Sequence, residues 1–194
     1  MVDEFREHAE LVEQLRASLP PNRFRHSLSV AGAALWLSRI HNIDRAKALY
    51  AALCHDYARH YEPQRLLNLA NEFAILVDEV DVKYPVLLHG PVGAKLVQVR
   101  FHCYDPQIGR AIALHTTGGA GMDSLAQLVY LADCIAPGRR FPGVERLRLL
   151  AMADLAFATW QALRANVRWL VESNRLLHPN TVAAYHEFQT MFQK

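Results

Sequence analysis

Two neighbouring residues with metal-binding side chains, His55 and Asp56, stand at the end of an apolar run over positions 48–54. The run has the composition of a buried helix. An imidazole and a carboxylate at the end of such a helix cost several kcal/mol or more unless both have partners. A bound metal ion satisfies both at once. The pair therefore predicts a metal site at the end of this helix.

Four further residues of ligand type complete the chain order His, His-Asp, His, His, Asp: His26, His89, His115 and Asp133. Each lies on a different predicted element, and a helical bundle can assemble ligands from facing helices. Iron, manganese and zinc accept neutral imidazole and carboxylate at hydrolytic centres. We expect a first metal ion to be bound by four of these side chains: His26, His55, Asp56 and Asp133.

The roles of His89 and His115 stay open at this point. Both stand at the edges of predicted loops, beside Gly90 and Thr116. In one arrangement they hold a second metal ion with Asp56 as the bridging ligand, as in sites that clamp the attacking and leaving oxygens. In the other they donate hydrogen bonds directly to the phosphates of a substrate.

The remaining histidines and the cysteines are predicted to be structural. The three cysteines are far apart and form no Cys-x-x-Cys pair, which argues against a disulfide framework and a thiolate zinc site. We expect them to be small buried hydrophobes in a reducing compartment. The histidines expected to be ordinary surface or capping residues are His8, His41, His60, His102, His178 and His186.

Composition limits the class of protein and of partner. A chain of 194 residues with 52% hydrophobic and 21% charged residues fits one globular domain. A formal charge of +2 gives no argument for a nucleic acid polymer or a membrane as partner. The local basic pair Arg139–Arg140 suits a small anionic ligand. With no signal peptide and no apolar stretch of about 20 residues, we expect a cytoplasmic protein.

Almost every segment has the 3.6-residue period of a helix, so the expected fold is an all-α bundle. The expected helices span about 5–19, 22–40, 44–55, 65–70, 92–101, 106–114, 123–135, 144–171 and from 179 to near the C-terminus. Asp44 is the expected N-cap of the third helix. The segments 71–84 and 87–91 are expected to be irregular, and 116–121 is a glycine-rich loop.

Five ordered motifs carry a resemblance to a known family. They are Arg25–Val30 (RHSLSV), Ala51–Arg59 (AALCHDYAR), Leu88–Ala94 (LHGPVGA), Ala111–Gly118 (AIALHTTG) and Tyr130–Asp133 (YLAD). Together they resemble the HD-domain superfamily over roughly residues 20 to 160. Within it, they are similar to the YqeK-like symmetrical diadenosine tetraphosphate hydrolases. The resemblance implies one HD domain over 1–194, with a metal-site core at about 20–140 and C-terminal helices at about 144–194.

The resemblance also implies an iron-dependent enzyme that splits diadenosine tetraphosphate into two ADP molecules. Manganese, magnesium and zinc are the alternative metals, and a homodimer is an open alternative to a monomer. The positions matching the family's metal ligands are His26, His55, Asp56 and Asp133. The positions matching its nucleotide contacts are His26, 56–59, His89, His115, Thr116 and Asp133. Two positions depart from the family, with Arg59 in place of lysine and Ala136 in place of glutamate.

The expected mechanism is metal-assisted hydrolysis of a polyphosphate. A metal lowers the pKa of water and neutralises phosphoryl charge, and Asp56 can orient the water. Arg59 and Arg139 supply charge-assisted bonds to the phosphates. Thr116 adds a neutral donor. His89 or His115 protonates the departing phosphate.

Three other functions are weighed against this one. They are hydrolysis of another nucleotide by an HD-type enzyme, di-iron oxygenation of an organophosphonate or polyol, and nucleotide sensing without turnover. The arginines and the threonine–glycine turn favour a phosphate substrate over an uncharged polyol.

Overall fold

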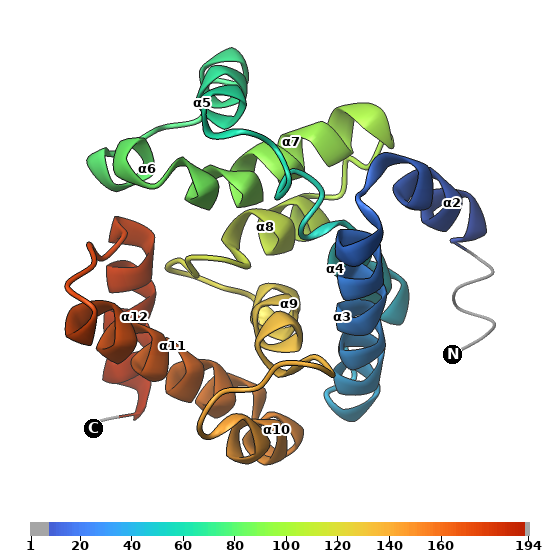
Figure 1. Ribbon diagram of the computed structural model, residues 1–194. Helices are drawn as coiled ribbons and strands as arrows, with labels where there is room; N and C mark the ends of the chain where they lie inside the picture. Colours follow the sequence, from blue (N-terminus) through green and yellow to red (C-terminus); the bar gives the residue numbers. More distant parts are fainter. Residues whose placement is uncertain (1–7, 193–194) are drawn as a thin grey trace.

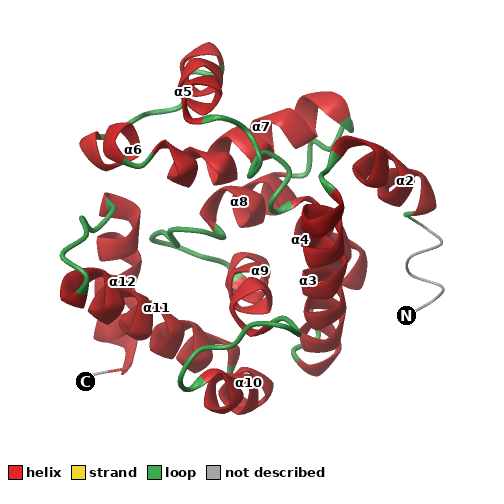
Figure 2. Cartoon of the chain, in the orientation of Figure 1, coloured by secondary structure: helices red, strands yellow, loops and turns green. Residues whose placement is uncertain are grey.

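The computed structural model describes residues 8–192, and this part of the chain is helical without a β-strand (Figures 1 and 2). The predicted all-α class is confirmed. The elements are α2 (Ala9–Ser18), α3 (Pro21–Ile40), α4 (Arg45–Cys54), α5 (Pro63–Glu72), α6 (Glu79–Lys83), the 3₁₀ helix η1 (Pro85–Leu88), α7 (His89–Arg100), α8 (Pro106–Leu114), α9 (Ser124–Ile135), α10 (Val144–Ala153), α11 (Leu155–Glu172) and α12 (Pro179–Phe192).

Helix α9 forms the centre of the bundle. Its sequence, SLAQLVYLADCI, is apolar on nearly every face, as expected of a helix that is covered on all sides. It contacts α3, α4, α8, α10 and α11. Figure 1 shows α9 end-on inside this ring, with α7 beyond α8 and with α5 and α6 outside α7. The last turn of α9 therefore reaches the same interior as the ends of α4 and α8.

Aspartate caps fix where several of these helices begin. The side chain of Asp44 accepts a hydrogen bond from the amide of Lys47 (3.0 Å) at the start of α4, as predicted. Asp105 does the same for Gln107 (2.8 Å) at α8, where Pro106 is the first helical residue. Each cap satisfies an amide that has no partner within its helix.

The predicted long helix over 144–171 is wrong. The chain instead forms two helices, because the backbone at Asp154 is extended (φ −152°, ψ 111°). The Asp154 side chain accepts from the amide of Phe157 (2.9 Å) and so begins α11. An aspartate in the middle of the predicted helical pattern acts here as the N-cap of a second helix.

The interruption predicted over 87–91 and the irregular segment 71–84 also need correction. Helix α7 begins at His89, directly after η1, so His89 lies on a helix rather than in a loop. The segment 71–84 contains α6, which begins with a capping box formed by Asp78 and Asp81. The first expected helix starts at Ala9, and its predicted apolar residue Phe5 lies outside the described residues. Within residues 8–192, no helix is both long and apolar enough to cross a membrane.

Candidate metal centre

The six predicted ligands come together where helices begin or end. His26 lies in the second turn of α3, and Asp133 lies in the last turn of α9. His115 directly follows α8, and His89 is the first residue of α7. The pair His55–Asp56 directly follows α4. Side chains at such positions project beyond the helix ends, so five elements contribute to one interior site.

Asp56 lies at the centre of this cluster. Its Oδ1 is 3.1 Å from the Nε2 of His89 and 3.6 Å from the Nε2 of His115. Its Oδ2 is 3.7 Å from the Nε2 of His55 and 3.8 Å from the Nε2 of His26. Each carboxylate oxygen therefore faces two imidazoles, and the geometry divides into a His26–His55–Asp56 trio and an Asp56–His89–His115 trio.

Three of these imidazoles are oriented by the backbone in the same way. The Nδ1 of each donates to the carbonyl three residues earlier in the chain. Since a carbonyl only accepts, the hydrogen of the neutral ring is on Nδ1, and Nε2 presents a lone pair. The distance is 2.7 Å for His55 and for His115. The carbonyls belong to Ala52, Val86 and Ile112.

Two observations show that this donor set fits a metal ion. The Nε2 of His55 is fully buried and has no hydrogen-bond partner in the described structure. The Nε2 atoms of His89 and His115 are 3.1 Å apart. Metal–nitrogen bonds of about 2.0–2.1 Å at right angles place two ligand nitrogens about 3 Å apart. Buried lone pairs that face one another at this separation are suited to a shared cation.

The charges of the cluster match this interpretation. Burial alone would raise the pKa of Asp56, but its contacts with the imidazoles of His115 and His89 hold it far below its usual range. Burial lowers the pKa of His55 to about 4 and also lowers that of His89. For His115, burial is outweighed by the hydrogen bond and charge of Asp56, which raise its pKa. At neutral pH the site is thus an ionised carboxylate among imidazoles of which two favour the neutral form.

Asp133 joins the cluster through His26 and Arg139. Its Oδ1 is 3.0 Å from the Nε2 of His26 and forms an ion pair with the Nη2 of Arg139. The Nε of Arg139 donates to the Asp133 carbonyl (2.9 Å). Burial opposes ionisation of Asp133, but His26 and the nearby positive charges lower its pKa. Arg139 therefore contacts Asp133 although residue 136 is alanine, where the family that the motifs resemble has glutamate.

Positive charge surrounds the cluster. Arg59 is half-buried, and burial together with the charges of Arg23 and Arg139 lowers its pKa. Arg23 is a site residue that the sequence analysis missed. Its Nη1 is 3.4 Å from the Oδ2 of Asp56. The available signal was its position three residues before His26, which places both side chains on one face of α3.

Thr116 lies against the imidazole pair, as its sequence position suggested. Its Oγ1 is 3.1 Å from the Nε2 of His89 and 3.0 Å from the Nε2 of His115. The loop after it is held by α12, because the Thr181 hydroxyl donates to the Thr117 carbonyl (2.8 Å). The threonine hydroxyl thus lies at the edge of the site on a fixed turn.

A third group of ligand-type side chains, Asp78, Asp81 and His178, is explained by helix capping. The Nδ1 of His178 accepts from the amide of Asn180 (3.0 Å), so its hydrogen is on Nε2, which faces the carboxylates of Asp78 (3.3 Å) and Asp81 (3.4 Å). Nε2 then has no lone pair for a metal. The other histidines expected to be structural also lie outside the two histidine–aspartate trios of the described residues.

Comparison with known proteins agrees with this geometry. The HD domain family matches residues 23–138, a range that contains all six cluster residues. The chain is 33% identical over 177 residues to the Bacillus subtilis protein named symmetrical bis(5'-nucleosyl)-tetraphosphatase, covering 91% of this chain and 95% of that protein. It is 32% identical over 178 residues to the protein of the same name from Halalkalibacterium halodurans, with 91% and 94% covered.

A solved structure is similar over nearly the whole chain. It is a Clostridium acetobutylicum protein described as a predicted HD superfamily hydrolase involved in NAD metabolism. The TM-score is 0.91 at 30% sequence identity, with 95% of this chain and 97% of that chain covered. The ordered ligand set, the helical bundle and the matched range lead to one assignment: the chain belongs to the HD domain family.

Proposed function

We propose that this protein is a metal-dependent hydrolase that splits diadenosine tetraphosphate at its central bridge into two ADP molecules. The observation that carries the proposal is the convergence of four imidazoles on Asp56, with three arginine side chains near the cluster. The resemblance of its motifs to the symmetrical hydrolases, and the shared name of its relatives, supply the substrate.

The proposed metal ligands divide between two sites that share Asp56. His26, His55 and Asp56, with Asp133 beside them, would hold a first metal ion. Asp56, His89 and His115 would hold a second metal ion in the two-metal version of the site. A bound divalent metal would lower the pKa of water and neutralise phosphoryl charge. Iron is the proposed metal on the resemblance of the motifs to an iron-dependent family, and the imidazole-rich donor set suits iron, manganese or zinc better than magnesium.

The substrate phosphates are bound by the chain's own cations. Arg23, Arg59 and Arg139 approach the cluster from three different segments, and guanidinium groups bind phosphate oxygens through charge-assisted pairs. Thr116 donates a further hydrogen bond to the phosphates, and Asp56 orients the attacking water through a carboxylate oxygen. The cluster and its arginines thus bind one half of the substrate as an ADP-like unit.

The group that assists the departing phosphate depends on whether one or two metal ions bind. If only the first metal ion binds, the Nε2 of His115 is free to donate a proton, and its raised pKa favours that role. If both metal ions bind, His89 and His115 are ligands, and Arg139 stabilises the departing ADP as an anion. Metal analysis of the purified protein decides between one and two ions per chain and identifies the metal.

Product analysis in oxygen-18 water tests the reaction directly. The water oxygen bonds to one central phosphorus, and the bridging oxygen leaves with the other half. Two ADP molecules form, one of which carries the label on its terminal phosphate. ATP and AMP as the main products would contradict the proposal. Turnover of a different nucleotide alone would favour another HD-type phosphohydrolase, oxygen consumption would favour an oxygenase, and tight binding without turnover would favour a sensor.

Three further features belong to the same proposal. We place the protein in the cytoplasm, because its substrate is a nucleotide and its three cysteines are unpaired. Residues 1–194 are proposed to be one HD domain, a view that the continuous core from Leu11 to Phe188 supports. A homodimer is proposed as a state to be tested by light scattering coupled to size-exclusion chromatography.

A further inference from the structure

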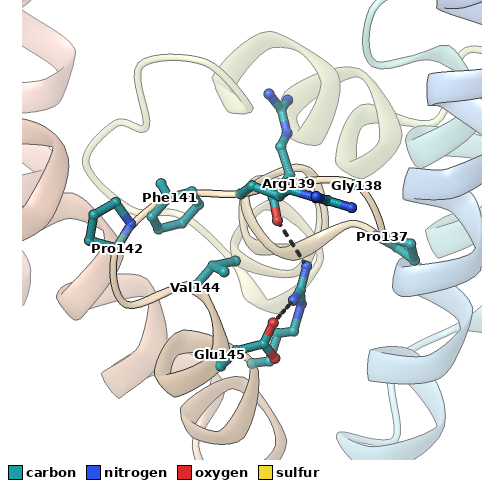
Figure 3. A pocket seen from close by; sticks show the side chains of 9 residues that line it. Pro137, Gly138, Arg139, Phe141, Pro142, Val144 and Glu145 are labelled. Atoms are coloured by element: carbon teal, nitrogen blue, oxygen red, sulfur yellow. Dashed lines mark hydrogen bonds and ion pairs between the residues drawn. The ribbon is translucent and has the colours of Figure 1, made fainter.

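A groove of about 820 Å³ lies beside the metal centre, and Arg139 is the one lining residue that takes part in the proposed mechanism. It is lined by Pro137, Gly138, Arg139, Arg140, Phe141, Pro142, Val144, Glu145 and Arg148. Figure 3 shows Phe141 and Pro142 at one end of the loop, Pro137 at the other and Arg139 between them. Because the Arg139 side chain also contacts Asp133, this residue joins the groove to the cluster.

The groove is held in shape by Arg148 of α10. Its guanidinium donates to the carbonyls of Ile135 (3.0 Å), Ala136 (3.2 Å) and Arg139 (3.3 Å), and it pairs with Glu145. Figure 3 draws the contacts to the Arg139 carbonyl and to Glu145. A half-buried arginine that binds the last carbonyl of α9 and two carbonyls of the loop fixes the loop relative to α9 and α10. It also neutralises the one acidic side chain of the groove.

Two side chains of the groove have no structural explanation in the fold. Arg140 is exposed, and no ion pair or side-chain hydrogen bond holds it within residues 8–192. Phe141 is 40% exposed, although it lies next to a prolyl residue and a buried Val144. The Arg140 guanidinium without an ion pair, beside the exposed ring of Phe141, suits a ligand with a phosphate and a flat base. Bases stack on aromatic rings, and arginine pairs with phosphate.

We propose that this groove binds the second nucleoside diphosphate half of the substrate. The inference rests on the proposed function, which requires two identical halves to be held on either side of the cleaved bridge. Arg139 stands at the border between the halves. Arg140 would bind the phosphates of the second half, and Phe141 would stack on its base. The Cα atoms of Arg139 and Phe141 are two residues apart and so at most about 7 Å from each other, within reach of one nucleotide.

Binding measurements test the groove without requiring turnover. The two ligands are ADP and a diadenosine tetraphosphate analogue with a methylene group in place of the central bridging oxygen. Both occupy the cluster, and only the analogue extends into the groove. We expect the analogue to bind wild type more tightly than ADP. This advantage should fall about tenfold in Phe141→Ala and in Arg140→Ala, or about 1.4 kcal/mol, as for loss of one stacked base or charged contact.

Matched substitutions outside the groove serve as controls. Arg146→Ala removes an exposed arginine of α10 that does not line the groove, and Tyr104→Ala removes an exposed ring between α7 and α8. Both should keep the advantage of the analogue over ADP. Equal binding of the two ligands by wild type, or an advantage retained in both groove variants, would overturn the inference. A wild type that shows the groove-dependent advantage but yields no ADP from diadenosine tetraphosphate would instead overturn the proposed function.

Discussion

The Nε2 atoms of His89 and His115 face each other across 3.1 Å, although each neutral ring has its hydrogen on the opposite nitrogen. The hydrogen bond and charge of Asp56 raise the pKa of His115, and a proton on this ring would relieve the repulsion between the two lone pairs in the metal-free protein. A metal cation replaces that proton. Metal binding should therefore release protons and stabilise the fold.

Replacement of His115 by asparagine is the sharpest test of its role as a ligand. Asparagine can keep the donor to the Ile112 carbonyl while it removes Nε2. We expect lower metal content and a loss of turnover above about 100-fold, since even outer-shell changes at metal sites cost 10–100-fold. His186→Asn, on the exposed face of α12, is the control and should retain both. Normal metal content and turnover in His115→Asn would exclude His115 as a ligand.

Arg23 should contribute to substrate binding. Removal of its guanidinium in Arg23→Ala should raise KM about tenfold, as expected for one charge-assisted contact, and leave the metal content unchanged. Arg25→Ala removes an exposed arginine of the same helix and should not change KM. Steady-state kinetics on both variants checks this, and equal KM values would show that Arg23 serves only to pair with Asp56.

Arg139 should affect both substrate halves. Arg139→Ala should raise KM by at least about tenfold through loss of a phosphate contact, with metal content retained. Arg139→Lys keeps the charge but loses the planar fork, so it should recover only part of the affinity. Kinetics and metal analysis distinguish this from a role in metal retention, in which the metal content would fall along with the activity.

Gly90 should be indispensable for the approach of α7 to α8. A Cβ at this position would lie 2.7 Å from the Ala113 carbonyl oxygen, which is backbone and cannot turn aside. Gly90→Ala should lower the free energy of unfolding by about 1–3 kcal/mol and displace His89 from His115, so that metal content falls. At Gly93 the nearest atom is 3.7 Å away, so Gly93→Ala should be tolerated. Equal urea midpoints for the two variants would contradict this packing argument.

Acid should destabilise the metal-free protein through His55. Its pKa is about 4 in the fold and about 6.5 in an unfolded chain, so the unfolded state binds the extra proton between these values. Stability is therefore lost as pH falls from about 6.5 towards 4, by at most about 3 kcal/mol. His89, whose pKa is also lowered, contributes loss in the same direction, whereas His115, with its pKa raised, contributes none. Urea unfolding of chelator-treated protein should show a shallower loss in His55→Asn, and parallel curves would refute the assignment.

The sequence alone predicted the elements and ligand types whose signals are local. Asp44 caps α4 as its side chain chemistry suggested, and the His55–Asp56 pair lies in the interior as the apolar run before it implied. Arg23 was missed, although its spacing from His26 places it on the same face of α3 as that predicted ligand. The break at Asp154 was missed, since the apolar period continues on both sides and only the extended backbone reveals the cap.

The groove beside Arg139 illustrates a second limit of sequence reasoning. The basic pair Arg139–Arg140 indicated an anionic ligand, but the two side chains have different surroundings: one reaches Asp133 and the other faces solvent. The loop that carries both side chains is held by Arg148 of the following helix, which donates hydrogen bonds to backbone carbonyls. Hydrogen bonds to backbone carbonyls cannot be predicted from residue types, because every residue has a carbonyl.

The carbonyls that orient His55, His89 and His115 have an evolutionary consequence. In many metalloproteins a carboxylate side chain holds each histidine ligand, so a substitution at that partner damages the site. Here the acceptors are main-chain atoms of Ala52, Val86 and Ile112, and every amino acid supplies the same oxygen. The hydrogen-bond acceptors of the three histidines are thus retained under any substitution at these positions that leaves the local backbone in place. This is compatible with a scaffold that is about 30% identical to its relatives.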